Sequence, residues 1–403
     1  MTEATTSHPP EDLRVERPAT DHASSSLRNA ELRELVVCSL EPWDEIWRRN
    51  QFFVNALLQR NPALRVLFIE PAADVLFDLT RRQRPSLPRF RRVLAHGRLR
   101  TFRPLKPLPR RLGSLTDVLL LRQVQFAVRA VGFMRPVLWI NDVTYAPLIA
   151  RTGWPSLYDV TDDWLLAPLP PRELKRLGPL DALAVAQADE VVVCSPALAK
   201  SRGKTRPVSL VPNGVDIEHF RRPRPRPSDL PAAPTAVYVG SLHDARLDVE
   251  LVADLAEALP RLNIVLVGPD SLSAESHDLL SHRPNVQLVG ARPYEDVPAY
   301  LQHADVVIVP HRVSPFTESL DPIKAYECLA ITTPTVATPV AGFKEQAAAL
   351  QVVGRESFAD RVAETMTLPM QRHKGVESVD WDIRSRAFES VLLKTGAPAG
   401  EMS

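Results

Sequence analysis

PHRVSPFTESLDPIKAYECLAITTPTVATPV, residues 310–340, combines the end of an apolar strand, a polar loop, a helix and a second strand. Lys324 and Glu327 lie three positions apart, so a helix places them on one face. A cation and a carboxylate near a helix start, just beyond the carboxyl end of a strand, suit a ligand with a phosphate and a sugar hydroxyl. The alternative interpretation is an exposed ion pair on a solvated helix.

Short apolar runs separated by longer helical patterns extend from this stretch in both directions. The runs are continuous rather than alternating, which is typical of strands covered on both faces. Helices are predicted over 47–60 and 248–259. Strand, helix and strand at this spacing predict a parallel α/β sheet, with a mixed α+β fold as the alternative. The predicted strands are LVVCSL (35–40), RVLFIEP (65–71), PVLWIND (136–142), SLYDVTDD (156–163), EVVVCSP (190–196), VSLVPNGVD (208–216), TAVYVGSL (235–242), NIVLVGP (263–269), VQLVGARP (286–293), DVVIVPH (305–311), TPTVATPV (333–340) and QVVGR (351–355).

A proline-rich segment, FRRPRPRPSDLPAAP at 220–234, divides the pattern into two halves. Proline blocks both helix continuation and strand pairing, so this segment is the best domain boundary. Two doubly wound halves facing a cleft fit the chain better than one (β/α)8 barrel, which needs an unbroken cycle. The predicted parts are a disordered tail over 1–30, a Rossmann-like domain over 31–222, a second Rossmann-like domain over 223–377, and a helix with a short tail over 378–403, the helix packing back on the first domain.

The composition is that of a soluble globular protein, with 45% apolar and 24% charged residues and a net charge of +1. The total charge therefore gives no argument for nucleic-acid binding. Three cysteines, far apart in sequence, are predicted to be buried thiols in a reduced, cytoplasmic setting. No secretory signal precedes the first strand, and no run approaches the ~18 apolar residues that span a bilayer.

Glycines follow three predicted strands of the second half, at Gly240, Gly268 and Gly290. In an open α/β sheet this is where the backbone must come close to a phosphate or nucleotide. GxGxxG and GxxxxGK[ST] do not occur, which excludes the ordinary dinucleotide and P-loop sites. Asn213 and Gly214 in VPNGVD form a turn dipeptide that tolerates positive φ.

Several motifs, in their order and spacing, resemble the GT-B glycosyltransferases of family 4 (group 1), in particular the bacterial branch that acts in cell-surface polysaccharide synthesis. The resemblance covers nearly all of residues 35–393. The motifs that carry it are SLEPWDEIWRRNQFF (39–53), YDVTDDW (158–164), VPNGVD (211–216), YVGSLHDARLD (238–248), RPYEDVPAYLQHADVVIVPHR (292–312), DPIKAYECLA (321–330) and SVDWDIRSRAFESVLL (378–393).

This resemblance implies that the second domain binds a nucleotide-sugar donor and that the first binds the acceptor. Glu327 matches the glutamate that bonds the donor ribose, while Lys324 and Arg246 match the cations that neutralise the diphosphate. Such enzymes use the nucleotide sugar as a substrate, with no cofactor and no bound metal ion. The expected donor-binding residues are Gly240, Arg246, Gly268, Asp321, Pro322, Lys324 and Glu327.

The family often places a catalytic His or Asp after the strand that ends near residue 160, which makes Asp162 the first candidate here. Asp163 is the second candidate and Asp142 a further one. Two adjacent aspartates could instead cap a helix. Family 4 enzymes retain anomeric configuration, which implies same-face attack by an acceptor hydroxyl, with the leaving phosphate helping to take its proton.

The chain departs from the family pattern at four positions. Ser319 replaces the first glutamate of E-x7-E, Ser241 replaces an arginine, Arg246 replaces a lysine, and Thr332 or Thr333 replaces a glycine. The predicted function is transfer of a sugar to a cell-surface glycan or lipid-linked acceptor. Two alternatives remain open: a UDP-sugar epimerase of the same fold, and a catalytically inactive binding subunit of glycosyltransferase form.

Residues 81–111 contain twelve Lys or Arg and no Asp or Glu, together with seven Phe or Leu. Three interpretations compete: a solvated basic loop, a surface for anionic lipid and a lipid-linked acceptor, and a nucleic-acid surface. The fold context disfavours nucleic acid. The predicted location is cytoplasmic, with peripheral contact at the inner membrane face through this segment.

Overall fold

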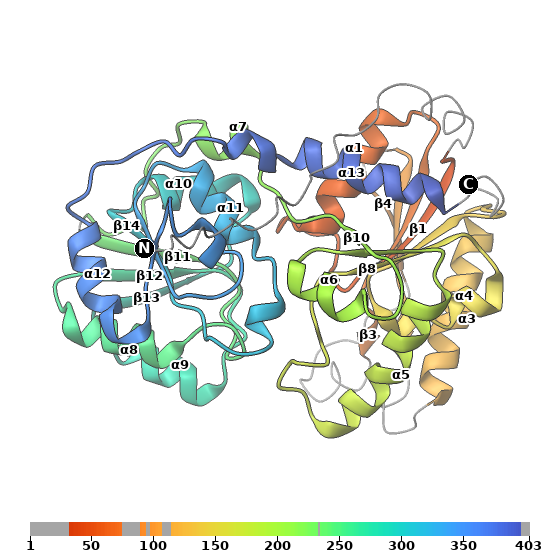
Figure 1. Ribbon diagram of the computed structural model, residues 1–403, viewed down its shortest axis with the longest axis horizontal. Helices are drawn as coiled ribbons and strands as arrows, with labels where there is room; N and C mark the ends of the chain where they lie inside the picture. The colour runs from red at the N-terminus through yellow and green to blue at the C-terminus, as the bar shows by residue number, and fades with distance from the viewer. Residues whose placement is uncertain (1–31, 75–88, 94–96, 107–113, 233, 396–403) are drawn as a thin grey trace, which may run out of the picture. The chain divides into compact units, whose positions relative to one another are not determined.

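A computed structural model describes residues 32–74, 89–93, 97–106, 114–232 and 234–395 (Figure 1). The predicted tail over 1–30 lies outside these residues, as do 396–403 and the segments 81–88, 94–96 and 107–111 of the basic stretch. The described residues from Leu32 onward form one compact unit. Within the described part of the chain, no helix is both long and apolar enough to cross a bilayer.

The first half is built on an eight-stranded sheet with the strand order β10-β9-β8-β7-β1-β2-β5-β4. Every neighbouring pair is parallel except β4 and β5, which are antiparallel. The strands are β1 (Glu34–Cys38), β2 (Arg65–Ile69), β4 (Arg89–Arg92), β5 (Leu99–Arg103), β7 (Val137–Ile140), β8 (Ser156–Val160), β9 (Glu190–Val193) and β10 (Ser209–Leu210). A separate parallel pair joins β3 (Ala73–Asp74) to β6 (Leu105–Lys106).

The second half carries a six-stranded, wholly parallel sheet with the order β13-β12-β11-β14-β15-β16. Its strands are β11 (Thr235–Val239), β12 (Asn263–Val267), β13 (Val286–Gly290), β14 (Val306–Val309), β15 (Thr335–Ala337) and β16 (Gln351–Val352). The predicted fold class, two Rossmann-like doubly wound sheets, is confirmed. The boundaries at 222 and 377 stay predictions.

Helices follow most of the strands and cover the sheets, as parallel crossovers require (Figure 1). Those of the first half are α1 (Arg49–Arg60), α3 (Ser114–Ala130), α4 (Leu148–Thr152), α5 (Pro171–Gln187), α6 (Pro196–Arg202) and α7 (Ile217–Arg221). Those of the second half are α8 (Val249–Ala258), α9 (Ala274–Ser281), α10 (Val297–Gln302), α11 (Ile323–Ala330) and α12 (Phe358–Thr365). The chain then returns to the first half as α13 (Trp381–Lys394).

Alternate residues of β1 enter different apolar clusters, which explains why its sequence is apolar throughout. Val36 and Cys38 pack in the cluster that contains residues of α3 and α5. Leu35 and Val37 pack in the cluster that contains residues of α1 and α13. Both faces of the sheet are therefore buried, and a continuous run of apolar residues is what such a strand needs.

The last helix, α13, packs against α1 (Figure 1). Stacked rings join the two helices, with centroid separations of 4.6 Å for Phe52 and Trp381 and 4.5 Å for Phe53 and Phe388. At the C-terminal end of α1, Arg60 forms an ion pair of 2.7 Å with Glu389 of α13. The C-terminal helix is thus part of the core of the first half.

All twelve predicted strands are present, but the basic stretch holds structure that its sequence did not suggest. Its segment Leu99–Arg103 is the strand β5, which pairs with β2 inside the sheet and buries Leu99, Thr101 and Phe102. Arg98 donates hydrogen bonds to three backbone carbonyls, those of Leu58, Asn61 and Leu64. Part of the basic stretch is therefore framework rather than surface loop.

Candidate functional site

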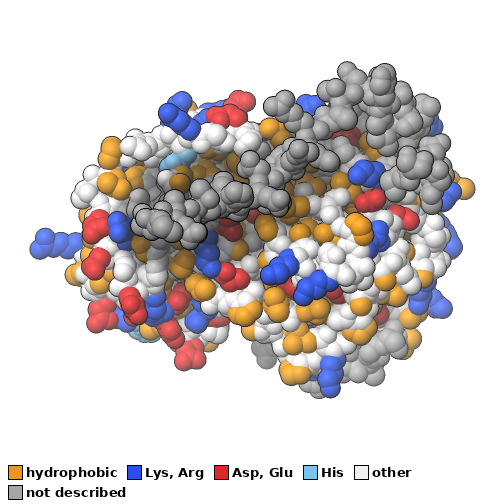
Figure 2. Space-filling view, in the orientation of Figure 1, with side chains coloured by type: hydrophobic (Ala, Val, Ile, Leu, Met, Phe, Trp, Pro, Cys, Tyr) orange, Lys and Arg blue, Asp and Glu red, His pale blue; other side chains and the backbone are white. Residues whose placement is uncertain are grey.

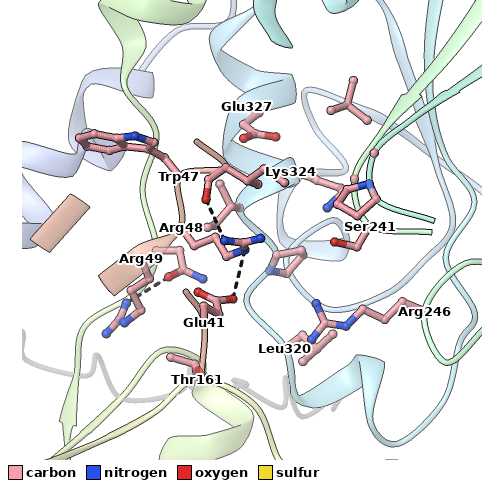
Figure 3. Close-up of a pocket in the computed structure, with 18 of the residues that line it drawn as sticks. Glu41, Trp47, Arg48, Arg49, Thr161, Ser241, Arg246, Leu320, Lys324 and Glu327 are labelled. Carbon is pink, nitrogen blue, oxygen red and sulfur yellow. Dashed lines mark hydrogen bonds and ion pairs between the residues drawn. The ribbon is translucent and has the colours of Figure 1, made fainter. Parts of the chain in front are cut away.

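A pocket of about 480 Å³ lies between the carboxyl ends of the two sheets (Figure 3). Its walls include segments that follow β1 and β8 in the first half, and β11, β12 and β14 in the second, together with the start of α11. The carboxyl edge of a parallel sheet is the usual ligand-binding edge, because loops there can diverge. The volume lies within the range of small-molecule sites.

Lys324 and Glu327 both line this pocket from α11. The helix begins at Ile323, directly after Pro322, whose φ of −71° and lack of a free N–H suit a helix start. Its opposite face buries Ala325, Cys328 and Leu329 in the core of the second half, which turns residues 324 and 327 outward. Among the described residues neither charged side chain has an ion-pair or hydrogen-bond partner, so the simple surface ion pair is not observed.

Two of the three predicted strand-end glycines also line the pocket. A Cβ atom at Gly240 would lie 2.0 Å from Lys324 Cε and 2.5 Å from its Nζ, so the lysine side chain passes directly over this glycine. A Cβ atom at Gly268 would lie 2.0 Å from the carbonyl oxygen of Gly240. Both glycines have positive φ, 154° and 153°. Gly290 is not in the wall, and a Cβ there would meet nothing within 4 Å.

Arg246 and Asp162 face each other across the pocket, one from each half. A guanidinium nitrogen of Arg246 donates to Asp162 Oδ1 at 2.8 Å, and the Arg246 Cζ lies 5.6 Å from the centre of the Phe316 ring. The structure therefore brings together a predicted catalytic residue and a predicted phosphate-binding residue that are 84 positions apart.

Asp163 does not reach the pocket. Its two carboxylate oxygens accept hydrogen bonds from Arg202, at 3.0 and 3.1 Å, and the side chain is buried. Asp142 also lies outside the wall, and its side chain accepts from the backbone N–H of Thr144. Of the three candidate aspartates, only Asp162 borders the pocket.

Asp321 and Pro322 line the pocket, but the Asp321 carboxylate is committed to other partners. One oxygen accepts from the backbone N–H of Asn213 at 2.5 Å, and the other accepts from the Tyr326 hydroxyl at 2.7 Å. Asn213 in turn accepts from Arg49 at 3.1 Å, within a buried pair between Arg49 and Asp159. The VPNGVD segment is therefore a joint between the halves, and Asp321 is part of that joint.

The structure shows the surroundings of the departures from the family pattern other than Arg246. Ser319 is buried outside the wall, where its carbonyl accepts a 2.6 Å hydrogen bond from Ser195. Ser241 is exposed at the pocket wall. Helix α11 ends at Ala330, and the residue that caps it, Ile331, has an extended conformation with a φ of −85°, so this cap position requires no glycine.

Sequence reasoning missed charged residues of the first half that line the pocket, among them Glu41 and Arg48 (Figure 3). Arg48 Nε lies 3.5 Å from Glu41 Oε1, and Arg48 Nη1 lies 3.1 Å from Asp44 Oδ1. The signal was available, because both residues fall in the 39–53 motif directly after the first strand. Nothing in that motif separates them from the neighbouring charges of Asp44, Glu45 and Arg49.

Burial shifts the pKa values of three side chains in the pocket wall, those of Lys324, Glu327 and His311. Burial lowers the pKa of the Lys324 amine, while the negative charge of Glu327 opposes the change. Burial raises the pKa of Glu327, and Lys324 opposes that change. Burial, followed by the positive charges of Lys324 and Arg246, lowers the pKa of His311 well below its usual value, so this ring is neutral. An anion bound beside Lys324 would stabilise the charged amine and offset part of the free-energy cost of burying it.

Groups of three or more His, Cys, Asp or Glu side chains that could hold a metal ion do not occur in the part of the chain that the structure describes. The three cysteines are buried free thiols, as predicted.

Comparisons with known proteins agree with this architecture. Residues 233–367 match the sequence family described as "Glycosyl transferases group 1". The chain is 27% identical over 251 residues to TuaH of Bacillus subtilis (strain 168), a protein named for teichuronic acid biosynthesis glycosyltransferase activity. That match covers 57% of this chain and 63% of TuaH, so it spans less than two thirds of that relative's length.

Solved structures with the same fold include OtsA, with a TM-score of 0.64 at 13% identity over 89% of this chain and 99% of that one. An α,α-trehalose 6-phosphate synthase from Burkholderia multivorans gives a TM-score of 0.59 at 13% identity, over 92% and 98% of the two chains. At such low identity these similarities concern the fold alone. Residues 233–367 are thus similar to the group 1 glycosyltransferases, and the chain has the GT-B fold of these solved structures.

Proposed function

We propose that this protein transfers a sugar from a nucleotide-sugar donor to a cell-surface glycan or a lipid-linked acceptor. The observation that carries the proposal is the convergence of Lys324 and Glu327 on one pocket, where neither side chain has an ion-pair or hydrogen-bond partner among the described residues. Unpaired, partly buried charges are costly unless a ligand completes them. A nucleoside diphosphate offers a polyanion for the lysine and a ribose diol for the glutamate.

In this proposal, the second half, residues 223–377, binds the donor. Lys324 and Arg246 hold the diphosphate, and the backbone at Gly240 and Gly268 allows it to approach closely. Pro322 and Asp321 shape the entrance to α11. One solved relative in fold is the E. coli trehalose-6-phosphate protein bound with UDP-2-fluoro glucose, which supports a nucleotide sugar as the donor class.

The first half, residues 31–222, binds the acceptor on the opposite side of the pocket. Asp162 faces the reacting centre there, next to Arg246. Negative charge grows on the departing diphosphate, and fixed cations that need no reorganisation stabilise it. We propose a retaining reaction without a bound metal ion, on the strength of the family resemblance. The name of TuaH supports an acceptor of the cell envelope.

A screen of UDP- and GDP-sugars by thermal shift tests the donor assignment, since a ligand that binds the native state raises the melting temperature. The proposal expects one nucleotide class to raise it and the corresponding nucleoside diphosphate to do the same. No shift with any of them would favour the inactive binding subunit. Conversion of the nucleotide sugar to its epimer in the absence of acceptor would favour the epimerase.

Glu327→Ala is expected to weaken nucleoside diphosphate binding about tenfold, because each hydrogen bond to a charged group contributes roughly 1.5 kcal/mol. The melting temperature should stay the same or rise, since a partly buried and unpaired carboxylate is removed. Calorimetry of UDP against 2′-deoxy-UDP, or the guanosine pair, locates the contact. Unchanged affinity for the ribose nucleotide would remove Glu327 from the ribose site.

Contact with the inner face of an anionic membrane is a second part of the proposal. The described part of the basic stretch includes β4 at the edge of the sheet, where Arg89, Arg92 and Phe90 are exposed, the phenylalanine by 42%. Figure 2 shows mixed charges elsewhere on the visible face, with acidic side chains gathered over α8 and α9. A local basic edge with an exposed aromatic side chain suits anionic head groups.

Co-sedimentation with phosphatidylglycerol vesicles at low salt measures this contact. Replacing Arg89 and Arg92 with serine is expected to weaken it at least tenfold, at about 1 kcal/mol for each arginine. The matched control replaces Arg222 and Arg386, two arginines that are 60% and 67% exposed on other segments, and should leave binding unchanged. An equal loss of vesicle binding in both variants would show that only the total charge of the protein matters.

A further inference from the structure

Glu41 is an acidic residue of the pocket wall that takes no part in the proposed donor contacts. It stands three residues after β1, and its backbone N–H donates to Ser39 Oγ at 3.0 Å. Asn50 Nδ2 donates to the same oxygen at 2.9 Å and to Asn141 Oδ1 at 2.8 Å. Ser39, Asn50 and Asn141 are all buried, so a fixed polar network positions Glu41.

Within the described part of the chain, the Glu41 carboxylate is held by an ion pair alone. Its nearest cation is Arg48, at 3.5 Å, and it has no hydrogen bond to any described residue. Asp162, by contrast, is bonded to Arg246 at 2.8 Å. With 39% of its side chain accessible at the pocket, Glu41 can accept a hydrogen bond from a substrate.

The charges around Glu41 come from both halves. Arg48 and Asp44 face it from its own segment, Asp162 from the segment after β8, and Arg246 from the second half. Burial is the largest influence and raises the pKa of Glu41 to about 7, with Arg48 and Arg246 opposing the rise and the two aspartates adding to it. A carboxyl group that titrates near neutrality can accept a proton in one step and release it afterwards.

We propose that Glu41 binds the attacking hydroxyl group of the acceptor and takes its proton. This inference rests on the proposed function. It makes a side chain, rather than the departing phosphate, the group that accepts the proton of the attacking hydroxyl. The hydroxyl oxygen forms a bond to the anomeric carbon of the donor sugar. The bond from that carbon to the diphosphate oxygen breaks, its electron pair leaves with the nucleoside diphosphate, and the hydroxyl proton passes to Glu41 and then to water.

The position of Arg246 is consistent with this role. Its guanidinium acts on Glu41 electrostatically and is bonded to Asp162 at 2.8 Å, while the proposed function gives it the donor diphosphate. Glu41, Asp162 and Arg246 line the same pocket, so an acceptor hydroxyl bonded to Glu41 would share that pocket with the donor. Arg48 Nε, at 3.5 Å from Glu41 Oε1, favours the ionised form that accepts the proton.

The test uses Glu41→Gln, which keeps the size of the side chain and removes the basic oxygen. Release of nucleoside diphosphate from the nucleotide sugar is followed between pH 5.5 and 8.5, with water and p-nitrophenyl glycosides as acceptor probes. The wild-type rate should rise with pH through about 7, because only the ionised carboxylate accepts a proton. The variant should lose about 100-fold in rate and lose this rise, while its affinity for the nucleoside diphosphate stays within about twofold.

Asp44→Asn is the matched control. Asp44 bonds the same arginine at 3.1 Å from the same segment, but it lies outside the pocket wall. This variant should keep the rise with pH and a rate within about threefold of wild type. If Glu41→Gln fails to fold, as judged by its melting curve, Glu41→Asp replaces it and should lower the rate without changing nucleotide affinity.

Two failures are distinguishable. A Glu41→Gln protein that binds the nucleoside diphosphate and turns over at the wild-type rate, with the same pH dependence, would overturn the role of Glu41 and leave the proposed function standing. A wild-type protein that binds neither UDP nor GDP and releases neither from a nucleotide sugar would overturn the proposed function itself.

Discussion

Replacing Lys324 with alanine is expected to weaken nucleoside diphosphate binding about 100-fold, with no loss of stability. A lysine that meets a phosphate in a partly buried site contributes roughly 1.5–3 kcal/mol through charge-assisted hydrogen bonds. The stability should not fall, because burial already lowers the pKa of this amine, which means that the folded protein disfavours its charge. Calorimetry for affinity and a melting curve for stability measure the two effects separately.

The pH dependence of the wild-type protein gives a second readout of the same residue. Because the pKa of Lys324 is lowered from 10.5, its ammonium form is lost at a lower pH than in free lysine. Nucleotide affinity should therefore fall as the pH rises through the alkaline range below 10.5. The alanine variant should lack this fall, since arginine does not titrate there.

Lys344→Ala provides the control for Lys324→Ala. Lys344 is an exposed lysine of the same half, paired with Glu318 at 2.6 Å, and it lies outside the pocket wall. Its loss should leave nucleotide affinity unchanged. If Lys324→Ala bound the nucleoside diphosphate as tightly as wild type, the phosphate would have to lie elsewhere in the pocket.

Replacing Gly268 with alanine is expected to lower the melting temperature by roughly 5–10 °C, from a destabilisation of about 3 kcal/mol. The new Cβ would lie 2.0 Å from the carbonyl oxygen of Gly240 and 2.6 Å from its carbonyl carbon. These are backbone atoms, and Gly240 is tied to the neighbouring strand by a 2.8 Å hydrogen bond from its N–H to the carbonyl oxygen of Val267. The two strand ends must therefore separate, which also moves the glycine beneath Lys324.

Gly290→Ala is the control that measures the cost of backbone strain without a steric clash. Gly290 has a φ of 77°, but a Cβ atom there would meet nothing within 4 Å. Its replacement should cost only the ~1 kcal/mol of an unfavourable backbone conformation. Differential scanning calorimetry compares the two variants, and equal shifts would show that strain alone sets the cost. Nucleotide affinity should fall only in Gly268→Ala.

The sequence by itself determined the fold class and the shared helix face of Lys324 and Glu327. Strands buried on both faces, such as β1, must be apolar at every position, and this pattern is local. Lys324 and Glu327 could be assigned to one face because they lie three positions apart, while the structure decided that this face lines the pocket. Gly240 and Gly268 could be marked as close-approach points because they follow apolar strands.

Strand β5 shows where local pattern fails. Its sequence, LRTFR, carries the arginines of a basic surface, yet three of its five side chains are buried because it pairs with β2 on one edge and β4 on the other. Pairing partners far away in the chain, and not the composition of the segment, decided its state.

Only the tertiary structure decided which acidic side chains reach the pocket. Asp162 and Asp163 are neighbours after one strand, and nothing in their sequence distinguishes them. Their partners do: Arg246, 84 positions away, holds Asp162 at the pocket, while Arg202, 39 positions away, buries Asp163. Glu41 was likewise one charge among several in its motif until Arg48, Asp162 and Arg246 surrounded it. A carboxylate takes its role from the charges and burial around it, and long-range packing supplies both.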